Sequence, residues 1–221
     1  MEIIPIGGKV MRVKIRNSII VLMVYILLAS SMSVHAALDP DESKYMENYK
    51  SIMHVMQEEM SKAPKTGDPS LDFLYEMIPH HEGAVSMSEN YLDYGNNEDI
   101  RRIATTIIQQ QLSDIKQMKA LLNQLKSNPQ VDKKQEKEYL KGYEAAYKRM
   151  MEKMEDAEPT GNINQDFLEE MIPHHEGAVA MAANLLKYTN NKDLQKIANQ
   201  IIANQSMQIK QMKKLQEAMD D

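Results

Sequence analysis

The stretch Met77-Ile78-Pro79-His80-His81-Glu82-Gly83-Ala84-Val85 occurs twice in the chain, and its second copy, at residues 171–179, is identical. A constant shift of 94 residues aligns the two copies and continues without a gap outside the motif, where Tyr49 falls on Tyr143 and Met118 on Met212. A fixed internal period indicates a duplicated structural unit. We therefore place the first unit at residues 45–126, a polar linker at 127–137 and the second unit at 138–221, with a flexible N-terminus at 37–44.

Each unit reads as three helical segments, because apolar side chains recur every three or four residues and no segment alternates as a strand would. In the first unit the segments start near Asp41, Pro69 and Asn97. Asp68 is a good N-cap before Pro69, and Gly95 is expected to end the second segment in the left-handed conformation. The prediction is an all-α helical bundle, and the sequence leaves open whether the two units form two bundles or one six-helix body.

Residues 1–36 read as a secretory signal peptide. A basic stretch from Met11 to Arg16 precedes an apolar run at 18–28, and Val34-His35-Ala36 provides a cleavage site. Met11 fits as the true start, because the preceding residues match no part of such a signal. An uncleaved anchor helix is the alternative, although the run is short for a membrane span. We expect cleavage after about Ala36, a periplasmic or secreted protein, and no other membrane association.

Composition restricts the choice of partners. The formal net charge is −6, and it becomes −9 without residues 1–36, which carry four basic side chains and one acidic side chain. An acidic surface argues against nucleic acid and anionic lipid, and it is compatible with cations. The chain has no cysteine, so it offers neither disulfides nor thiolates. The chain has 19 methionines, two phenylalanines and no tryptophan. This number of methionines exceeds what is needed to fill gaps in a hydrophobic core.

The motif itself lies on a helix. On a helical wheel, Met77 and His80 fall on the buried stripe of the second segment, and His81 falls at its edge. Pro79 and Gly83 each destabilise a helix interior, and their presence in both copies favours a local purpose. A single buried histidine or methionine is more often part of a core than a ligand. Two adjacent histidines flanked by methionines, with more methionines on the neighbouring helices, favour a metal site.

The donor atoms indicate which metal would bind. Thioether and imidazole suit Cu(I), and the same softness argument extends to Ag(I). Magnesium and calcium prefer oxygen ligands, and zinc would gain little from methionine. The sequence therefore predicts a Cu(I) or Ag(I) site.

The tandem motif, followed by a methionine and a distant Q-x-x-x-I-K-Q-M segment, resembles the bacterial "domain of unknown function" family 305 over nearly the whole expected mature chain. This resemblance implies two tandem ferritin-like helical-bundle units and, for copper-binding members, Cu(I) and Ag(I) binding in copper resistance. The ligand candidates that it implies are Met77, His80, His81, Met87 and Met118 in the first unit, and Met171, His174, His175, Met181 and Met212 in the second. Weaker candidates are Met56, Met60, Met150, Met154 and His54, the last of which aligns with Lys148.

Three functions compete. The leading one is a periplasmic Cu(I)- or Ag(I)-binding protein for sequestration, resistance or trafficking, which is not an enzyme and whose exchange partner the sequence does not identify. A di-metal ferritin-like oxidoreductase would need Glu-x-x-His pairs, whereas Glu76 precedes His80 by four residues. A non-metal helical module could instead bind a partner through methionines. We expect no catalytic residues, because the sequence shows neither a phosphate loop nor a nucleophile–base arrangement.

Overall fold

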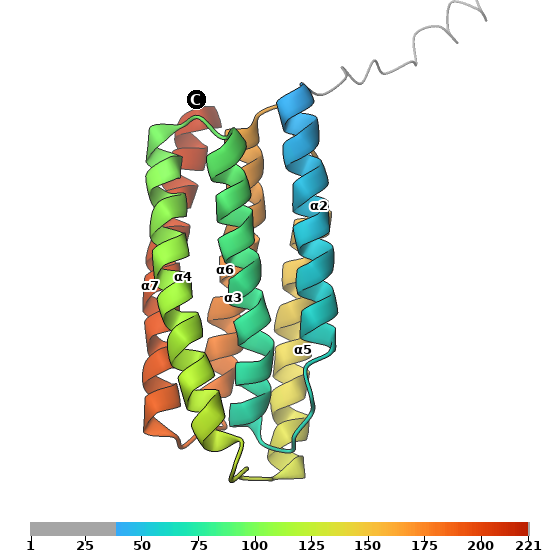
Figure 1. Cartoon of the computed structure of the whole chain (residues 1–221), viewed down its shortest axis with the longest axis vertical. Coiled ribbons are helices and arrows are strands. Elements are labelled where there is room, and N and C mark those ends of the chain that lie inside the picture. The colour runs from blue at the N-terminus through green and yellow to red at the C-terminus, as the bar shows by residue number, and fades with distance from the viewer. Residues whose placement is uncertain (1–38, 221) are drawn as a thin grey trace, which may run out of the picture. The chain divides into compact units, whose positions relative to one another are not determined.

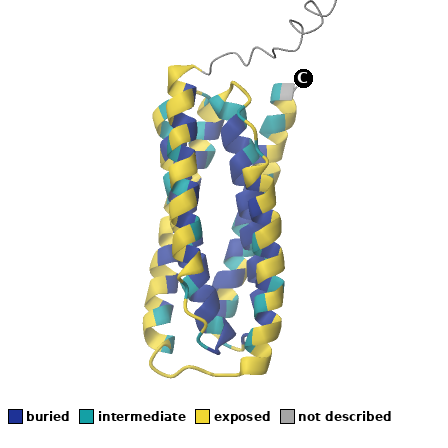
Figure 2. Ribbon diagram, turned by 90° about the vertical axis from the view of Figure 1, so that its right-hand side faces the viewer, coloured by how far each residue is buried: buried dark blue, intermediate teal, exposed yellow. Residues whose placement is uncertain are grey.

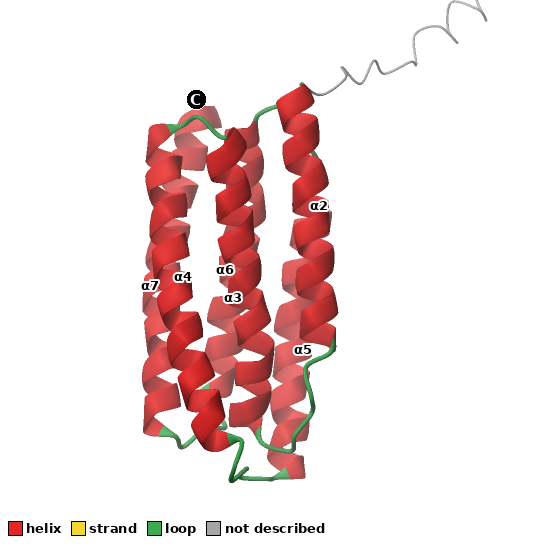
Figure 3. Ribbon diagram, in the orientation of Figure 1, coloured by secondary structure: helices red, strands yellow, loops and turns green. Residues whose placement is uncertain are grey.

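The computed structural model describes residues 39–220, and within this range it contains helices and no strand (Figure 3). The helices are α2 (Pro40–Ser61), α3 (Pro69–Tyr94), α4 (Glu98–Leu125), α5 (Lys133–Glu155), α6 (Ile163–Leu185) and α7 (Lys192–Asp220). The all-α prediction is confirmed. The predicted signal peptide lies outside the described residues. Across residues 39–220, no helix is long and apolar enough to cross a membrane.

Capping side chains decide where the helices begin. Asp68 accepts a hydrogen bond from the backbone N–H of Ser70 at 2.8 Å, as the sequence predicted. Caps of this kind typically contribute about 1 kcal/mol. Asp39 and Asp132 cap α2 and α5 in the same way. Residues 40–44 and 133–137, which we expected in a flexible N-terminus and in the linker, therefore belong to helices.

Gly95 ends α3 in a different way from the one predicted. Its backbone is extended, with φ −77° and ψ 145°, so the expected left-handed conformation is wrong. The position still requires glycine, because an added Cβ would lie 2.1 Å from Cε2 of Tyr91. The constraint here is the close approach of an aromatic ring, which helix-end statistics do not anticipate.

Each repeat forms a three-helix layer with its motif helix in the middle (Figure 1). In the first layer α3 packs between α2 and α4, and in the second α6 packs between α5 and α7. The layers meet through the pairs α3–α6 and α4–α7, and the described helices form one compact unit. Buried residues line the facing sides of the helices and exposed residues the outer sides (Figure 2). Neither layer has a complete core without the other.

Reciprocal hydrogen bonds join the layers with local two-fold symmetry. The Tyr45 hydroxyl donates to Oε2 of Glu170 at 2.5 Å, and the equivalent Tyr139 hydroxyl donates to Oε2 of Glu76 at 2.7 Å. All four side chains are buried. Backbone N–H groups in the loops repeat this reciprocity by donating to glutamates of the other layer, at 2.7 Å from Gly67 to Glu136 and 2.8 Å from Gly161 to Glu42. These bonds set the register of the two layers.

The buried Glu76 predicts a pH-dependent stability. Burial raises the pKa of Glu76 to about 7, although Lys65 and Tyr139 oppose the shift. The protonated form therefore stabilises the fold fully below the unfolded pKa of about 4.5, and this contribution is lost as the pH rises through about 7. Between about pH 5 and about pH 8, the free energy of unfolding of wild type should fall by about 2 kcal/mol relative to Glu76→Gln.

Urea unfolding of both proteins at several pH values measures this difference. Glu144→Gln is the matched control, because Glu144 is exposed on α5. It should differ from wild type by the same amount at every pH. A Glu76→Gln difference that does not change with pH would contradict the role of burial.

Candidate metal centre

The two motifs meet in the middle of the bundle. All four of their histidines are fully buried. The rings of His80 on α3 and His174 on α6 lie with centroids 3.9 Å apart and their planes tilted by 43°. The sequence analysis gave each unit its own set of ligands. The structure instead pairs the first histidine of one motif with the first histidine of the other.

A thioether contacts this pair. Sδ of Met150, on α5, lies 3.2 Å from Nε2 of His80. The motif glycine makes room for this sulfur, because a Cβ at Gly177 would lie 2.4 Å from it. In the other repeat, a Cβ at Gly83 would lie 2.7 Å from Sδ of Met56. The glycines therefore let thioethers lie directly against the histidine helices, and this close approach is a local purpose for glycine in the motif.

The second histidine of each motif faces the outer helices. The wheel placed His81 at the edge of the buried stripe, which is wrong: the ring is fully buried, because α4 packs against that side of α3. Its Nε2 lies 3.8 Å from Oδ2 of Asp114. His175 Nε2 lies 3.0 Å from Oε1 of Gln208. The repeat relates Asp114 to Gln208, so the two outer histidines meet a carboxylate in one layer and an amide in the other.

Sequence reasoning missed Asp114 and Gln208, although a signal was present. Asp114 stands four residues before Met118, which the sequence analysis named as a ligand candidate of the same helical segment. Residues three and four apart share a helix face. The spacing therefore predicts that Asp114 faces the motif helix. The 94-residue shift extends the same prediction to Gln208.

The imidazoles are poised to accept a ligand. Six of their eight ring nitrogens have no hydrogen-bond partner within the described part of the chain. Burial, and next the neighbouring His174, lower the pKa of His80 well below its usual value. Burial also lowers the pKa of His174 strongly, and that of His175 to about 4. His80, His174 and His175 are therefore neutral at neutral pH, and each of these rings keeps one nitrogen lone pair that can bind a metal ion.

The other predicted ligands divide into two groups. His54 is exposed on α2, where it lines a surface groove with Met46 and Met53. It is thus separate from the four buried rings. The remaining predicted methionines are all buried in the core: Met56, Met60, Met77, Met87, Met118, Met154, Met171, Met181 and Met212.

Carboxylates contribute little to this centre. No group of three or more His, Asp or Glu side chains in residues 39–220 could hold a metal ion. The glutamates that directly precede the motifs, Glu76 and Glu170, accept hydrogen bonds from tyrosines of the opposite layer. A metal bound at His80 and His174 would therefore draw its further ligands from thioethers, and this donor set fits a soft ion.

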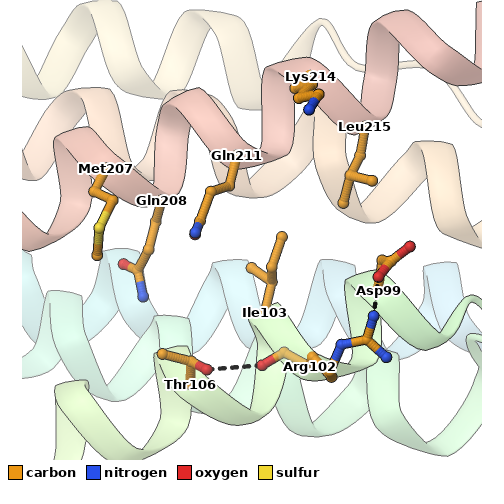
Figure 4. A pocket seen from close by; sticks show the side chains of 9 residues that line it. All are labelled: Asp99, Arg102, Ile103, Thr106, Met207, Gln208, Gln211, Lys214 and Leu215. Carbon is orange, nitrogen blue, oxygen red and sulfur yellow. Dashed lines mark hydrogen bonds and ion pairs between the residues drawn. The ribbon is translucent and has the colours of Figure 1, made fainter.

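A surface groove of about 480 Å³ runs between α4 and α7 (Figure 4). Gln208 and Met207 project from α7 toward Ile103 and Thr106 of α4. The Gln208 amide donates to Oε1 of Gln110 at 3.1 Å, while its carbonyl oxygen faces His175. The Gln208 side chain therefore stands between this groove and the nearest imidazole.

The chain belongs to the family described as "Domain of unknown function (DUF305)", which matches residues 70–216. The family resemblance seen in the sequence is thereby confirmed. None of the curated proteins matches the chain significantly.

Solved structures of CopM are similar to this chain. CopM in its Ag-bound form, obtained by soaking, is 30% identical, with a TM-score of 0.52 over 67% of this chain and 96% of CopM. The Cu(I)-bound form is 29% identical, with a TM-score of 0.52 over 68% and 96% of the two chains. A DUF305 fragment from Deinococcus radiodurans, 24% identical over 68% of this chain and 96% of its own, has a TM-score of 0.50 and supports the fold alone.

The contact between glycine and thioether predicts the effect of a methyl group. Gly177→Ala should destabilise the protein by about 1–3 kcal/mol, because the added Cβ overlaps Sδ of Met150. In a Met150→Ala background the cost should be smaller, because Sδ and Cγ are removed and only Cβ of residue 150, 2.9 Å from the added Cβ, remains. Chemical denaturation of the two single variants and the double variant measures this coupling. Helix propensity alone would make Gly177→Ala more stable by about 1 kcal/mol, and that result would contradict the packing role.

Proposed function

We propose that this protein binds Cu(I) and Ag(I) in the periplasm, or outside the cell, and serves to sequester or transport these ions. The observation that carries the proposal is the contact between the rings of His80 and His174, whose centroids lie 3.9 Å apart. Sδ of Met150 lies 3.2 Å from Nε2 of His80. Two imidazoles and a thioether brought together by three helices form a compact soft donor set.

The chemistry of these groups supports a monovalent ion. The imidazoles of His80 and His174 are buried, and burial lowers the pKa of both, so these neutral rings offer lone pairs without bringing charge into the core. Thioethers are neutral and soft as well. A divalent ion between His80 and His174 would lack the anionic ligands that offset its charge, because Glu76 and Glu170 are already bonded to tyrosines and Asp114 lies beside His81 instead.

The further ligands are part of the same proposal. His81 and His175 follow the paired histidines directly and are buried beside them. Met77 and Met171 precede the pair by three residues on the same helices. The buried methionines Met56, Met87, Met118, Met181 and Met212 complete the set from which additional ligands would come.

The place of action follows from the predicted signal peptide and from the acidic charge of the remaining chain. An exported acidic protein attracts cations outside the cytoplasm. CopM, which is similar to this chain, has been solved with Ag, with Cu(I) and with Cu(II). We therefore propose a role in copper and silver resistance or trafficking, with no catalysis, and metal exchange with a partner protein fits this role.

A competition titration tests the function. Purified protein should withdraw Cu(I) from a chromogenic chelator, and His80→Ala or His174→Ala should weaken binding by more than about 100-fold. This magnitude follows because the loss of groups that only orient a ligand already costs about 10–100-fold. His54→Ala is the matched control and should bind like wild type, because His54 is exposed and lies elsewhere. Absence of competition at micromolar Cu(I) would overturn the proposal.

A further inference from the structure

The buried centre needs a path from solvent, because all four imidazoles are fully buried. Two grooves flank the motif helices at positions that the 94-residue repeat relates. The α2–α3 groove has a volume of about 190 Å³ and is lined by Met56, Pro79 and Gly83. The α5–α6 groove has a volume of about 250 Å³ and is lined by the equivalent Met150, Pro173 and Gly177. In each groove, the motif proline and glycine face a methionine of the neighbouring helix.

One of these methionines connects its groove with the centre. Met150 lines the α5–α6 groove, and its sulfur also contacts Nε2 of His80. One thioether therefore spans the distance between the surface and the buried ring. Met56 holds the equivalent position in the α2–α3 groove, with its sulfur close to Gly83. A soft ion that binds such a sulfur from outside could move inward with a rotation of the flexible methionine side chain.

The charges around the grooves break the symmetry. Glu59 and Glu82 line the α2–α3 groove, together with the exposed Val55. In the α5–α6 groove, Lys153 replaces Glu59 and Arg149 replaces Val55.

The remaining glutamate of the α5–α6 groove is also more strongly neutralised. Glu176, the counterpart of Glu82, pairs with both Lys153 and Lys213 at 2.7 Å. Glu82 pairs with the single Lys119, also at 2.7 Å, and Glu59 pairs with Lys62 at 2.8 Å. The residues that line the α2–α3 groove thus carry two carboxylates and no cation, whereas those that line the α5–α6 groove carry two cations and one carboxylate.

We propose that the α2–α3 groove is the entrance for the soft monovalent cation, with Met56 as its first ligand, and that the basic lining closes the α5–α6 groove to cations. This inference rests on the proposed function. Clefts lined by one sign of charge raise the local concentration and the association rate of an oppositely charged ligand, by about 10–10³-fold in favourable cases. The same field repels cations where lysine and arginine line the cleft.

Val55→Arg combined with Glu59→Lys tests the proposal, because it gives the α2–α3 groove the side chains of its counterpart. Both positions are exposed, so the fold should tolerate the change. Protein is mixed with Cu(I) as its cationic acetonitrile complex, and excess bathocuproine disulfonate reports the unbound metal after timed intervals. Uptake should slow about tenfold at low salt, and the deficit should shrink at high salt because ions screen surface charges. Affinity and capacity at equilibrium should not change.

Two further variants complete the design. Arg149→Val combined with Lys153→Glu gives the α5–α6 groove an acidic lining and should accelerate uptake. Met207→Ser tests the α4–α7 groove with the residue that the first repeat carries at this position, Ser113, and it should leave the rate unchanged. The inference is overturned if the double variant Val55→Arg, Glu59→Lys takes up Cu(I) at the wild-type rate, or if Met207→Ser slows uptake instead. If wild type binds no Cu(I), the proposed function itself has failed.

Discussion

The burial of His80 against His174 is the constraint on which the rest of the structure depends. Two imidazoles in contact at the centre of a helical bundle displace apolar packing, and most nitrogens of the four motif rings lack a partner within residues 39–220. Each buried polar atom without a hydrogen bond costs about 1–3 kcal/mol. The surrounding structure holds the rings in place despite this cost: glycines admit the thioethers, and tyrosine–glutamate bonds fix the register of the two layers.

The duplication gains a structural meaning from this pair. One repeat supplies a single three-helix layer and a single central imidazole, so the His80–His174 pair exists only when both layers are packed together. A metal held between the layers would therefore stabilise their association, because a ligand that binds only the folded state adds its binding free energy to stability. The same two-fold arrangement creates a pair of equivalent surface grooves, and differences of charge in their linings then give the two grooves separate roles.

Much of this architecture could be predicted from the sequence, because it follows from local patterns. The 94-residue repeat, the cap at Asp68 and the buried stripe through Met77 and His80 each depend on neighbours along one helix. The pairing of His80 with His174 could not be predicted in this way, because a wheel describes one helix and contains no information on how two layers face each other. The burial of His81 was missed for the same reason, since the covering helix lies outside the wheel.

The proposed function requires that a soft ion binds between the two motifs. A crystal structure of the silver-loaded protein, with the ion located by its anomalous scattering, tests it most directly. A peak is expected between α3 and α6, within bonding distance of ring nitrogens of both His80 and His174 and of a methionine sulfur. Silver found only on the surface, or at two centres that each use side chains of a single repeat, would contradict it.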